Sequence, residues 1–311
     1  MDAAVTDAAV VDAAVIDAYH IDKARVRASF NRAANTYDAA AVLQKQVRLE
    51  MLSRLDLVNI KPKAILDAGC GTGHGGFALQ KRFLSAQVIS LDIAVGMLQQ
   101  TKLQRPLLQK MLHQQHLVCA DIEYLPIASN SMAMVWSNLA LQWCNDLDGA
   151  FSELARVLQP EGLIMFSTFG PDTLKELRAA SSFSNGQSGH THVSRFIDMH
   201  DIGDALIRAG FSTPVLDVEH YTLTYHDVKS VMTDLKSIGA HNATQGRARG
   251  LQGKGFLQNL TQQYEQFRSD TIENGGKLPA TFEVVYGHAW KAESQPHLDD
   301  GYAPITFKTR A

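Results

Sequence analysis

A regular alternation of short apolar runs with amphipathic helical segments begins at Lys63 and constrains the fold of this chain more than any other feature. Such an alternation is typical of βαβ units, in which helices join parallel strands and cover both faces of one sheet. Strands are expected at residues 64–67, 87–92, 116–121, 132–137 and 162–169. Helices between them are expected at residues 73–83, 95–103 and 147–158. The pattern therefore predicts a doubly wound α/β sheet, with ligands at the carboxyl ends of its strands.

The segments on either side of this pattern are predicted to add a helical lid and a smaller helical region. Residues 23–60 are mostly helical and precede the first strand, so they could fold over its ligand-binding edge. After the fifth strand, Asp172 is expected to cap a helix over residues 173–180, and a polar loop follows over residues 181–191. The remaining expected elements are an amphipathic helix at 201–209 closed by Gly210, a strand at 214–223, helices at 227–237 and 255–268, and a strand at 281–290.

Composition excludes several classes of protein. With 311 residues, of which 45% are hydrophobic and 20% charged, the chain can bury the core of one large domain. Its net charge of −3 gives no overall positive field of the kind that holds nucleic acid or anionic membranes. A membrane span would need about 18 consecutive apolar residues, and the sequence has no such run. We therefore expect neither nucleic acid nor a membrane among its partners.

The ends of the chain are predicted to lie outside the globular domain. Residues 1–22 repeat an Asp-Ala-Ala-Val theme and contain no Lys or Arg, so a signal peptide with a basic start is not expected. The low complexity of this segment predicts a disordered tail. We expect the domain to span residues 23–291, with residues 23–60 as the lid and residues 292–311 as an irregular tail.

Cysteine and histidine positions indicate neither disulfides nor a metal site. Cys70, Cys119 and Cys144 are far apart, form no CxxC pair and are expected at buried strand ends. This usage favours a reducing, cytoplasmic environment. His190 and His192 lack a third ligand, so no metal site is expected there.

A glycine-rich loop follows the first predicted strand directly. In the run Asp67-Ala68-Gly69-Cys70-Gly71-Thr72-Gly73, alternate glycines let the backbone turn tightly and approach a ligand with no Cβ in between. Asp92 ends the second strand, where a carboxylate can accept hydrogen bonds from both hydroxyls of a ribose. Asp121 and Ile122 end the third strand, at the expected adenine edge. Each acid could instead only cap the following helix.

A nicotinamide dinucleotide is the main competing ligand for this loop, because Gly71-Thr72-Gly73-His74-Gly75-Gly76 contains a GxGxxG string. That string begins late relative to the strand. The acidic Asp67 would repel a pyrophosphate, but it suits a zwitterionic methionine group beside a sulfonium. The loop therefore favours S-adenosylmethionine.

The same residues resemble a known family. Residues 66–73, Asp92 and residues 121–126 are similar to class I S-adenosylmethionine-dependent methyltransferases. More particular segments resemble the malonyl-acyl carrier protein O-methyltransferases of biotin synthesis; they lie at residues 30–38, 136–144, 235–240 and 283–288. The similarity runs from about Val26 to Trp290, with residues 99–115 as an insertion. It implies a Rossmann-like class I methyltransferase sheet with helices on both faces, an N-terminal helical lid and a small helical insertion on the substrate side.

The resemblance also implies a reaction, in which the methyl group of S-adenosylmethionine passes to the free carboxylate of a malonyl thioester on acyl carrier protein or coenzyme A. Such a carboxylate is already ionised, so the reaction needs orientation and exclusion of water rather than a general base. The residues expected to contact the cofactor are Asp67, Gly69, Gly71, Gly73, Asp92, Ile93, Met97, Asp121, Ile122, Asn138 and Leu139. Those expected to act on the substrate are Arg195, as a clamp on the carboxylate, with Tyr37, Gln142 and Trp143.

Several alternatives stay open on the sequence. Arg195 could pair at the surface with Asp198 or Asp201, and Trp143 could simply pack in the core. Weaker candidates for the substrate site are Lys236, His241, Arg247 and His288, and a basic run of Arg247, Arg249 and Lys254 is expected to meet an acidic carrier. The acceptor could also be a quinone precursor or a free dicarboxylate, and the chain could bind the cofactor without catalysing transfer.

Overall fold

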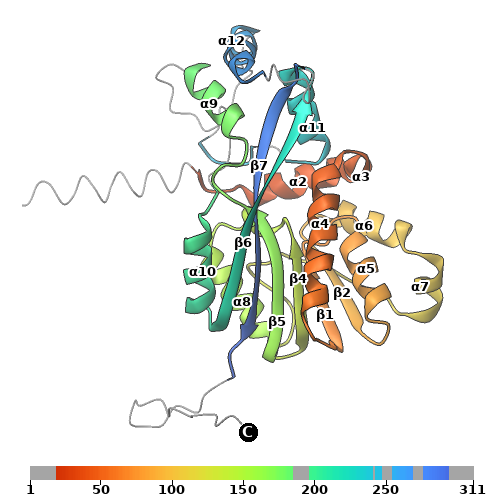
Figure 1. The fold of residues 1–311 in the computed structure, drawn as a ribbon. Helices are drawn as coiled ribbons and strands as arrows, with labels where there is room; N and C mark the ends of the chain where they lie inside the picture. Colours follow the sequence, from red (N-terminus) through yellow and green to blue (C-terminus); the bar gives the residue numbers. More distant parts are fainter. Residues whose placement is uncertain (1–18, 185–195, 241, 247–253, 269–275, 294–311) are drawn as a thin grey trace, which may run out of the picture.

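The computed structural model describes residues 19–184, 196–240, 242–246, 254–268 and 276–293, and it contains the doubly wound sheet. Seven strands form this sheet in the order β3-β2-β1-β4-β5-β7-β6 (Figure 1). They are β1 (Ala64–Ala68), β2 (Gln87–Asp92), β3 (His116–Cys119), β4 (Met132–Asn138), β5 (Leu158–Phe169), β6 (Phe211–Tyr225) and β7 (Leu278–Lys291). The first five strands run parallel, and β7 lies antiparallel between β5 and β6. The predicted fold class is confirmed.

Two apolar cores form because successive side chains of a strand point to opposite faces. Met134 and Trp136 of β4 belong to the core under α4 (Val42–Arg54), whereas Val135 between them belongs to the core under α8 (Leu147–Val157) and α10 (Met199–Arg208). All three side chains are fully buried. A sheet buried on both faces explains why its strands read as nearly continuous apolar runs.

The other helices follow the strands or precede the sheet. They are α2 (Lys23–Ala33), α3 (Tyr37–Ala40), α5 (His74–Arg82), α6 (Val95–Gln104), α7 (Leu107–Leu112), α9 (Lys175–Ser184), α11 (Val228–Ser237) and α12 (Lys254–Tyr264). In Figure 1, α9, α11 and α12 gather at the end of the long β6–β7 pair, where they form a cap beyond the sheet.

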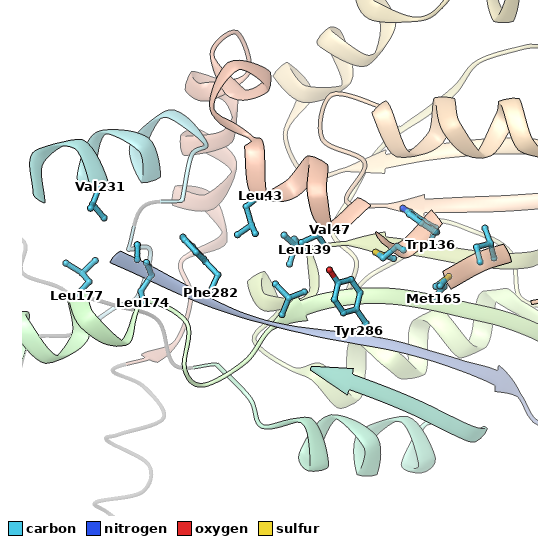
Figure 2. Close-up of a cluster of buried hydrophobic side chains, with 14 of the residues drawn as sticks. Leu43, Val47, Trp136, Leu139, Met165, Leu174, Leu177, Val231, Phe282 and Tyr286 are labelled. Carbon is cyan, nitrogen blue, oxygen red and sulfur yellow. The ribbon is translucent and has the colours of Figure 1, made fainter. Parts of the chain in front are cut away.

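The core under α4 continues from the sheet into this cap. Figure 2 shows Leu43 of α4, Leu177 of α9, Val231 of α11 and Phe282 of β7 in one cluster of buried side chains. The lid helix, the sheet and the cap therefore share one apolar core, which places the cap over the carboxyl ends of the parallel strands.

Helix α9 differs from its prediction because of the backbone at Leu174. This residue has a φ of 55°, outside the helical region, and its N–H donates to the Thr281 carbonyl at 2.6 Å. The helix therefore begins at Lys175 rather than at residue 173, and it continues through Ser184 into the segment predicted to be a loop. Asp172 does not cap it as predicted, since its carboxylate instead pairs with the Lys175 ammonium at 3.0 Å.

The start of the described chain corrects the predicted tail. Ile21 is only 7% exposed and forms a β-bridge with Thr244, and the Asp22 N–H donates to the Ala243 carbonyl at 2.9 Å. These residues pack on the fold although the sequence places them in a disordered segment. Residues 1–18 and 294–311 lie outside the described part of the chain, so the domain limits stay a prediction.

The cysteines also depart from their prediction. Cys70 is buried, but Cys119 is exposed and Cys144 is half-buried beyond β4. Cys119 is exposed because β3 is an edge strand of the sheet. Among the described helices, none is both long enough and apolar enough to cross a membrane.

Candidate active site

The glycine loop after β1 has the left-handed backbone that its glycines permit. The φ angles of Gly69, Gly71 and Gly73 are 78°, 54° and 90°. Such values are costly for residues with a Cβ. A Cβ on Gly69 would also lie 2.2 Å from the Cβ of Ala140, which is far inside van der Waals contact. The loop therefore packs against the residues after β4 as closely as backbone allows.

Asp92 holds this loop in place from the end of β2. Its Oδ2 accepts the Gly71 N–H at 2.9 Å, and its Oδ1 accepts the Ala94 N–H at 2.8 Å. Burial raises the pKa of the Asp92 carboxyl to about 6, although these backbone donors oppose the rise. The carboxyl remains largely ionised at neutral pH and borders the cavity beside the loop.

A first cavity of about 630 Å³ opens at the carboxyl ends of β1, β2, β3 and β4. Its lining is mostly apolar with a few polar groups, as in small-molecule sites. The lining residues are Lys23, Val26, Phe30, Tyr37, Gly69, Gly71, Leu91, Asp92, Ile93, Met97, Ala120, Asp121, Ile122, Asn138, Leu139, Ala140, Trp143 and Cys144.

The lid helices close this cavity on the side away from the sheet. Lys23 of α2 forms ion pairs with Asp121, at 3.0 Å, and with Glu123. Farther along α2, the Asn31 side-chain oxygen accepts the Gly96 N–H at 2.7 Å. These contacts tie the lid to the loop after β3 and to the first turn of α6, so the Asp121 carboxylate at the expected adenine edge is shared with Lys23.

A second cavity of about 1020 Å³ lies between the lid, the end of β5 and the cap. Its lining residues are Phe30, Tyr37, Gln44, Leu139, Gln142, Trp143, Phe169, Thr173, Leu174, Leu177, Phe196, Met232, Leu235, Lys236, Ile238, Ala240, Asn242 and Phe282. Phe30, Tyr37, Leu139 and Trp143 line both cavities. The two cavities therefore adjoin at these four side chains.

The junction is built from an aromatic group and a strained turn. The rings of Phe30 and Trp143 meet edge to face with centroids 5.4 Å apart, and the Phe30 and Tyr37 rings lie 6.5 Å apart. Leu139 has a φ of 50°, and its N–H donates to the Ser167 carbonyl at 3.1 Å and hydroxyl at 3.0 Å. A positive φ at a residue other than glycine is unfavourable and persists only where the surrounding contacts enforce it. Such residues are concentrated at functional sites.

Comparison with known proteins assigns the chain to a family. The methyltransferase-domain family matches residues 66–166. The malonyl-[acyl-carrier protein] O-methyltransferase of Methylovorus sp. (strain MP688) is 63% identical over 291 residues, which cover 93% of this chain and 96% of that protein. This chain belongs to the malonyl-[acyl-carrier protein] O-methyltransferase family. The protein of the same name from Gallionella capsiferriformans (strain ES-2) is 55% identical over 89% of this chain and 93% of its own length.

Solved structures agree with this family on the fold. A Bacillus halodurans protein described as a methyltransferase aligns with a TM-score of 0.55 and 18% identity, covering 79% of this chain and 99% of that one. The YcgJ protein of Bacillus subtilis aligns with a TM-score of 0.52 and 14% identity, and the alignment covers 78% of this chain and 98% of that one. At these identities the likeness concerns the fold alone.

The structure brings most of the predicted cofactor residues of this family member together. The first cavity is lined by Gly69, Gly71, Asp92, Ile93, Met97, Asp121, Ile122, Asn138 and Leu139. Gly73 does not line it, since it is the N-cap of α5 and a Cβ there would lie 2.5 Å from Cγ2 of Thr101. Its role is to let α5 begin close to α6.

Asp67 is likewise not among the residues that line the cavity, and its role as a cofactor contact stays a prediction. The residue is only 2% exposed, and a Cβ added to Gly75 or Gly76 would approach its Oδ2 to 3.2 or 3.1 Å. Burial raises the pKa of this carboxyl to about 7, with the charge of Asp92 adding to the rise and that of Arg48 opposing it. Asp67 therefore sits behind the glycine loop, against the start of α5.

The predicted substrate residues that the structure describes all line the second cavity. Tyr37 and Trp143 stand at the junction, and burial raises the pKa of the Tyr37 hydroxyl, which stays protonated. Gln142 lines the same cavity, and its amide donates to the Leu139 carbonyl at 2.6 Å. Gln142 therefore supports the strained turn at Leu139.

Several predicted residues lie outside the described part of the chain. They are Arg195, His190, His192, His241, Arg247 and Arg249. Phe196, next to Arg195, lines the second cavity. Among the described lining residues of that cavity, Lys236 is the cation. His288, another weaker candidate, borders a separate groove with Arg54 and Tyr286 instead.

Sequence reasoning misses several residues that line the cavities. Phe30 falls in a segment that resembles the family, but no local pattern marks it as a contact. Gln44 lies on the buried, otherwise apolar face of α4. A polar residue on such a face is unusual, and this was the one sequence signal that could have marked Gln44 as a functional residue. Phe169 and Phe282 look like ordinary strand residues, since their place beside the cavity depends on contacts between distant segments.

Proposed function

We propose that this chain transfers the methyl group of S-adenosylmethionine to the free carboxylate of a malonyl thioester on acyl carrier protein, which gives a methyl ester. The observation that carries this proposal is the meeting of the two cavities at Tyr37, Leu139 and Trp143. Relatives at 52% to 63% identity carry the name malonyl-[acyl-carrier protein] O-methyltransferase. That name favours this acceptor over a quinone precursor or free dicarboxylate, and an enzyme over a protein that only binds the cofactor.

The residues that line the first cavity suit S-adenosylmethionine in their chemistry. Asp92 offers an ionised carboxylate to ribose hydroxyls, and Ile93, Met97 and Ile122 offer an apolar wall for adenine. Gly71, which borders the cavity without a Cβ, lets a ligand approach its backbone, and Gly69 lets the loop pack on Ala140.

The chemistry that the cofactor supplies is a methyl group activated by a positive sulfonium. The acceptor carboxylate is ionised at neutral pH, so the chain has no proton to remove. Its work is to hold one carboxylate oxygen in line with the methyl carbon and to exclude water. Phe30 and Trp143 form an apolar wall at the junction that serves this exclusion.

The carboxylate needs partners that orient it without pairing so strongly that it loses nucleophilicity. We propose Arg195 as the cationic partner, with Lys236 on the wall of the second cavity as the alternative. The protonated Tyr37 hydroxyl is a neutral donor at the junction. The apolar remainder of the second cavity suits the thioester and its linker.

We also propose that the carrier-bound thioester is preferred to malonyl-coenzyme A and that the product enters biotin synthesis in the cytoplasm. An acyl carrier protein is acidic, and this chain has a net charge of −3, so a local basic face has to guide the encounter.

The test is an assay of the purified protein with S-adenosylmethionine and three acceptors: malonyl-carrier, malonyl-coenzyme A and free malonate. Mass spectrometry should detect the methyl ester on malonyl-carrier, with less on coenzyme A and little on malonate. Growth rescue of a cell that cannot make this ester, scored as loss of its biotin requirement, tests the biological role. A methylated quinone precursor with no malonyl ester would refute the proposal.

A further inference from the structure

Gln44 is a buried amide on the wall of the second cavity that the reaction described above does not use. It lies in the first turn of α4 and is only 9% exposed, between the core residues Leu43 and Val47. Its backbone carbonyl accepts the Asn138 side-chain N–H at 3.2 Å. Asn138 lines the first cavity, so this contact fixes Gln44 at the end of the second cavity that faces the cofactor.

The side chain of Gln44 has no hydrogen-bond partner within the described part of the chain. Its Oε1 is fully buried and unsatisfied. Buried amides are almost always hydrogen-bonded, because an unpaired polar group in the protein interior is destabilising. Gln80 illustrates the usual case, since its amide donates to the Ala86 carbonyl at 2.9 Å and the Phe83 carbonyl at 3.3 Å. The NH₂ group of Gln44 likewise has no acceptor among the described residues, so it is free to donate to a ligand in the second cavity.

We propose that Gln44 is a positioning residue that donates an amide N–H to the free carboxylate of the malonyl group. This inference rests on the proposed function. Oε1 is the fully buried end of this amide, so the NH₂ group is the end that can reach the second cavity. The acceptor carboxylate must lie at the junction with the first cavity, and Gln44 lines the second cavity together with the junction residues Tyr37 and Leu139.

A neutral amide suits this position better than a charge. The start of α4 is fixed by Leu43 and Val47, which pack in one core with the sheet, so little ordering of the donor is needed when the substrate binds. A neutral hydrogen bond orients the carboxylate and leaves most of its electron density for attack on the methyl carbon. Gln44 and Tyr37 would then together orient the malonyl carboxylate, while a cation farther from the reacting oxygen balances its negative charge.

The first test compares Gln44→Met with Gln46→Met, which makes the same change on the exposed face of the same helix. Gln44→Met should lower kcat/KM for malonyl-carrier about ten- to a hundredfold, the scale of a lost hydrogen bond to a charged group. Its affinity for S-adenosylmethionine in calorimetry should stay within twofold, and its Tm should stay equal or rise, because no protein hydrogen bond is lost. Gln46→Met should change none of these values.

The second test uses Gln44→Glu, which keeps the shape and adds a negative charge beside the substrate carboxylate. Its kcat/KM should fall further at pH 8 and recover as the pH is lowered, since a protonated carboxyl again donates a hydrogen bond. Unchanged kinetics in Gln44→Met would overturn the inference, and so would a fall in Tm with a parallel loss of cofactor affinity. A parent enzyme that methylates another acceptor but not malonyl-carrier would instead refute the proposed function.

Discussion

The Gly71 backbone N–H donates to Oδ2 of Asp92 at 2.9 Å, so the turn after β1 and the last residue of β2 form one unit. The two residues are 21 positions apart in the chain, and both line the first cavity. Asp92 thus both shapes the loop and faces the ligand, and its removal should affect binding more than folding.

We predict that Asp92→Ala weakens S-adenosylmethionine binding by about 1.5–3 kcal/mol, the scale of a lost hydrogen bond to a charged group. The fold should survive, because the sheet around Asp92 does not depend on this side chain. Calorimetry gives the affinity, and circular dichroism checks the fold. Native spectra with unchanged affinity would remove Asp92 from the cofactor site.

The glycine loop yields a prediction with a matched control. Gly69 and Gly210 both have positive φ, at 78° and 89°, but a Cβ on Gly69 meets Ala140 at 2.2 Å whereas one on Gly210 meets nothing within 4 Å. Gly210→Ala should cost about 1 kcal/mol in unfolding free energy through backbone strain alone. Gly69→Ala should cost clearly more and should abolish cofactor binding. Denaturant titrations that give equal losses for both variants would show that the close packing at Gly69 is unimportant.

The pKa of Asp67 predicts how the stability of the ligand-free protein varies with pH. Burial raises the pKa of this carboxyl to about 7, above its unfolded value, so the folded state binds its proton more tightly. The resulting stabilisation is fully present below the unfolded pKa, near 4, and is lost as the pH rises through 7. Asp67→Asn should therefore raise the Tm more at pH 8 than at pH 4. Equal shifts at both pH values would contradict this prediction.

The cation that holds the substrate carboxylate can be assigned by two variants. Arg195→Ala should leave cofactor affinity intact and lower turnover on the malonyl thioester, because Arg195 is expected to grip the carboxylate. Lys236→Ala, on the wall of the second cavity, is the comparison. Kinetics equal to the parent for Arg195→Ala, with a loss for Lys236→Ala, would transfer the role to Lys236.

The carrier should be recognised by a basic run on this otherwise mildly acidic chain. Reversing Arg247 and Arg249 to Glu should slow turnover on malonyl-carrier, chiefly through association and more strongly at low salt. Turnover on malonyl-coenzyme A should change less. An equal loss on both substrates would place the pair in the active site or the fold, and no loss would place the docking face elsewhere.

The sequence by itself determined the sheet and the loop beside it, because both are encoded in local patterns. Apolar runs of strand length alternate with helical periods, and glycines follow β1 where a tight turn is required. The position of Asp92 at the end of a strand was enough to predict that it borders the first cavity. Parallel strands bring such ends to one edge of the sheet, so residues such as Gly69, Asp92 and Asp121 could be placed at the first cavity from the sequence.

Only the tertiary structure determined which residues line the second cavity and whether Asp67 and Asp92 face the first cavity. Asp67 is the penultimate residue of β1 and Asp92 is the last residue of β2, yet Asp67 is covered by the start of α5 while Asp92 borders the cavity. Gln44, Phe169 and Phe282 come from the lid, β5 and β7, and they meet because those segments share one core. Such contacts depend on how whole elements pack, which no local period in the sequence records.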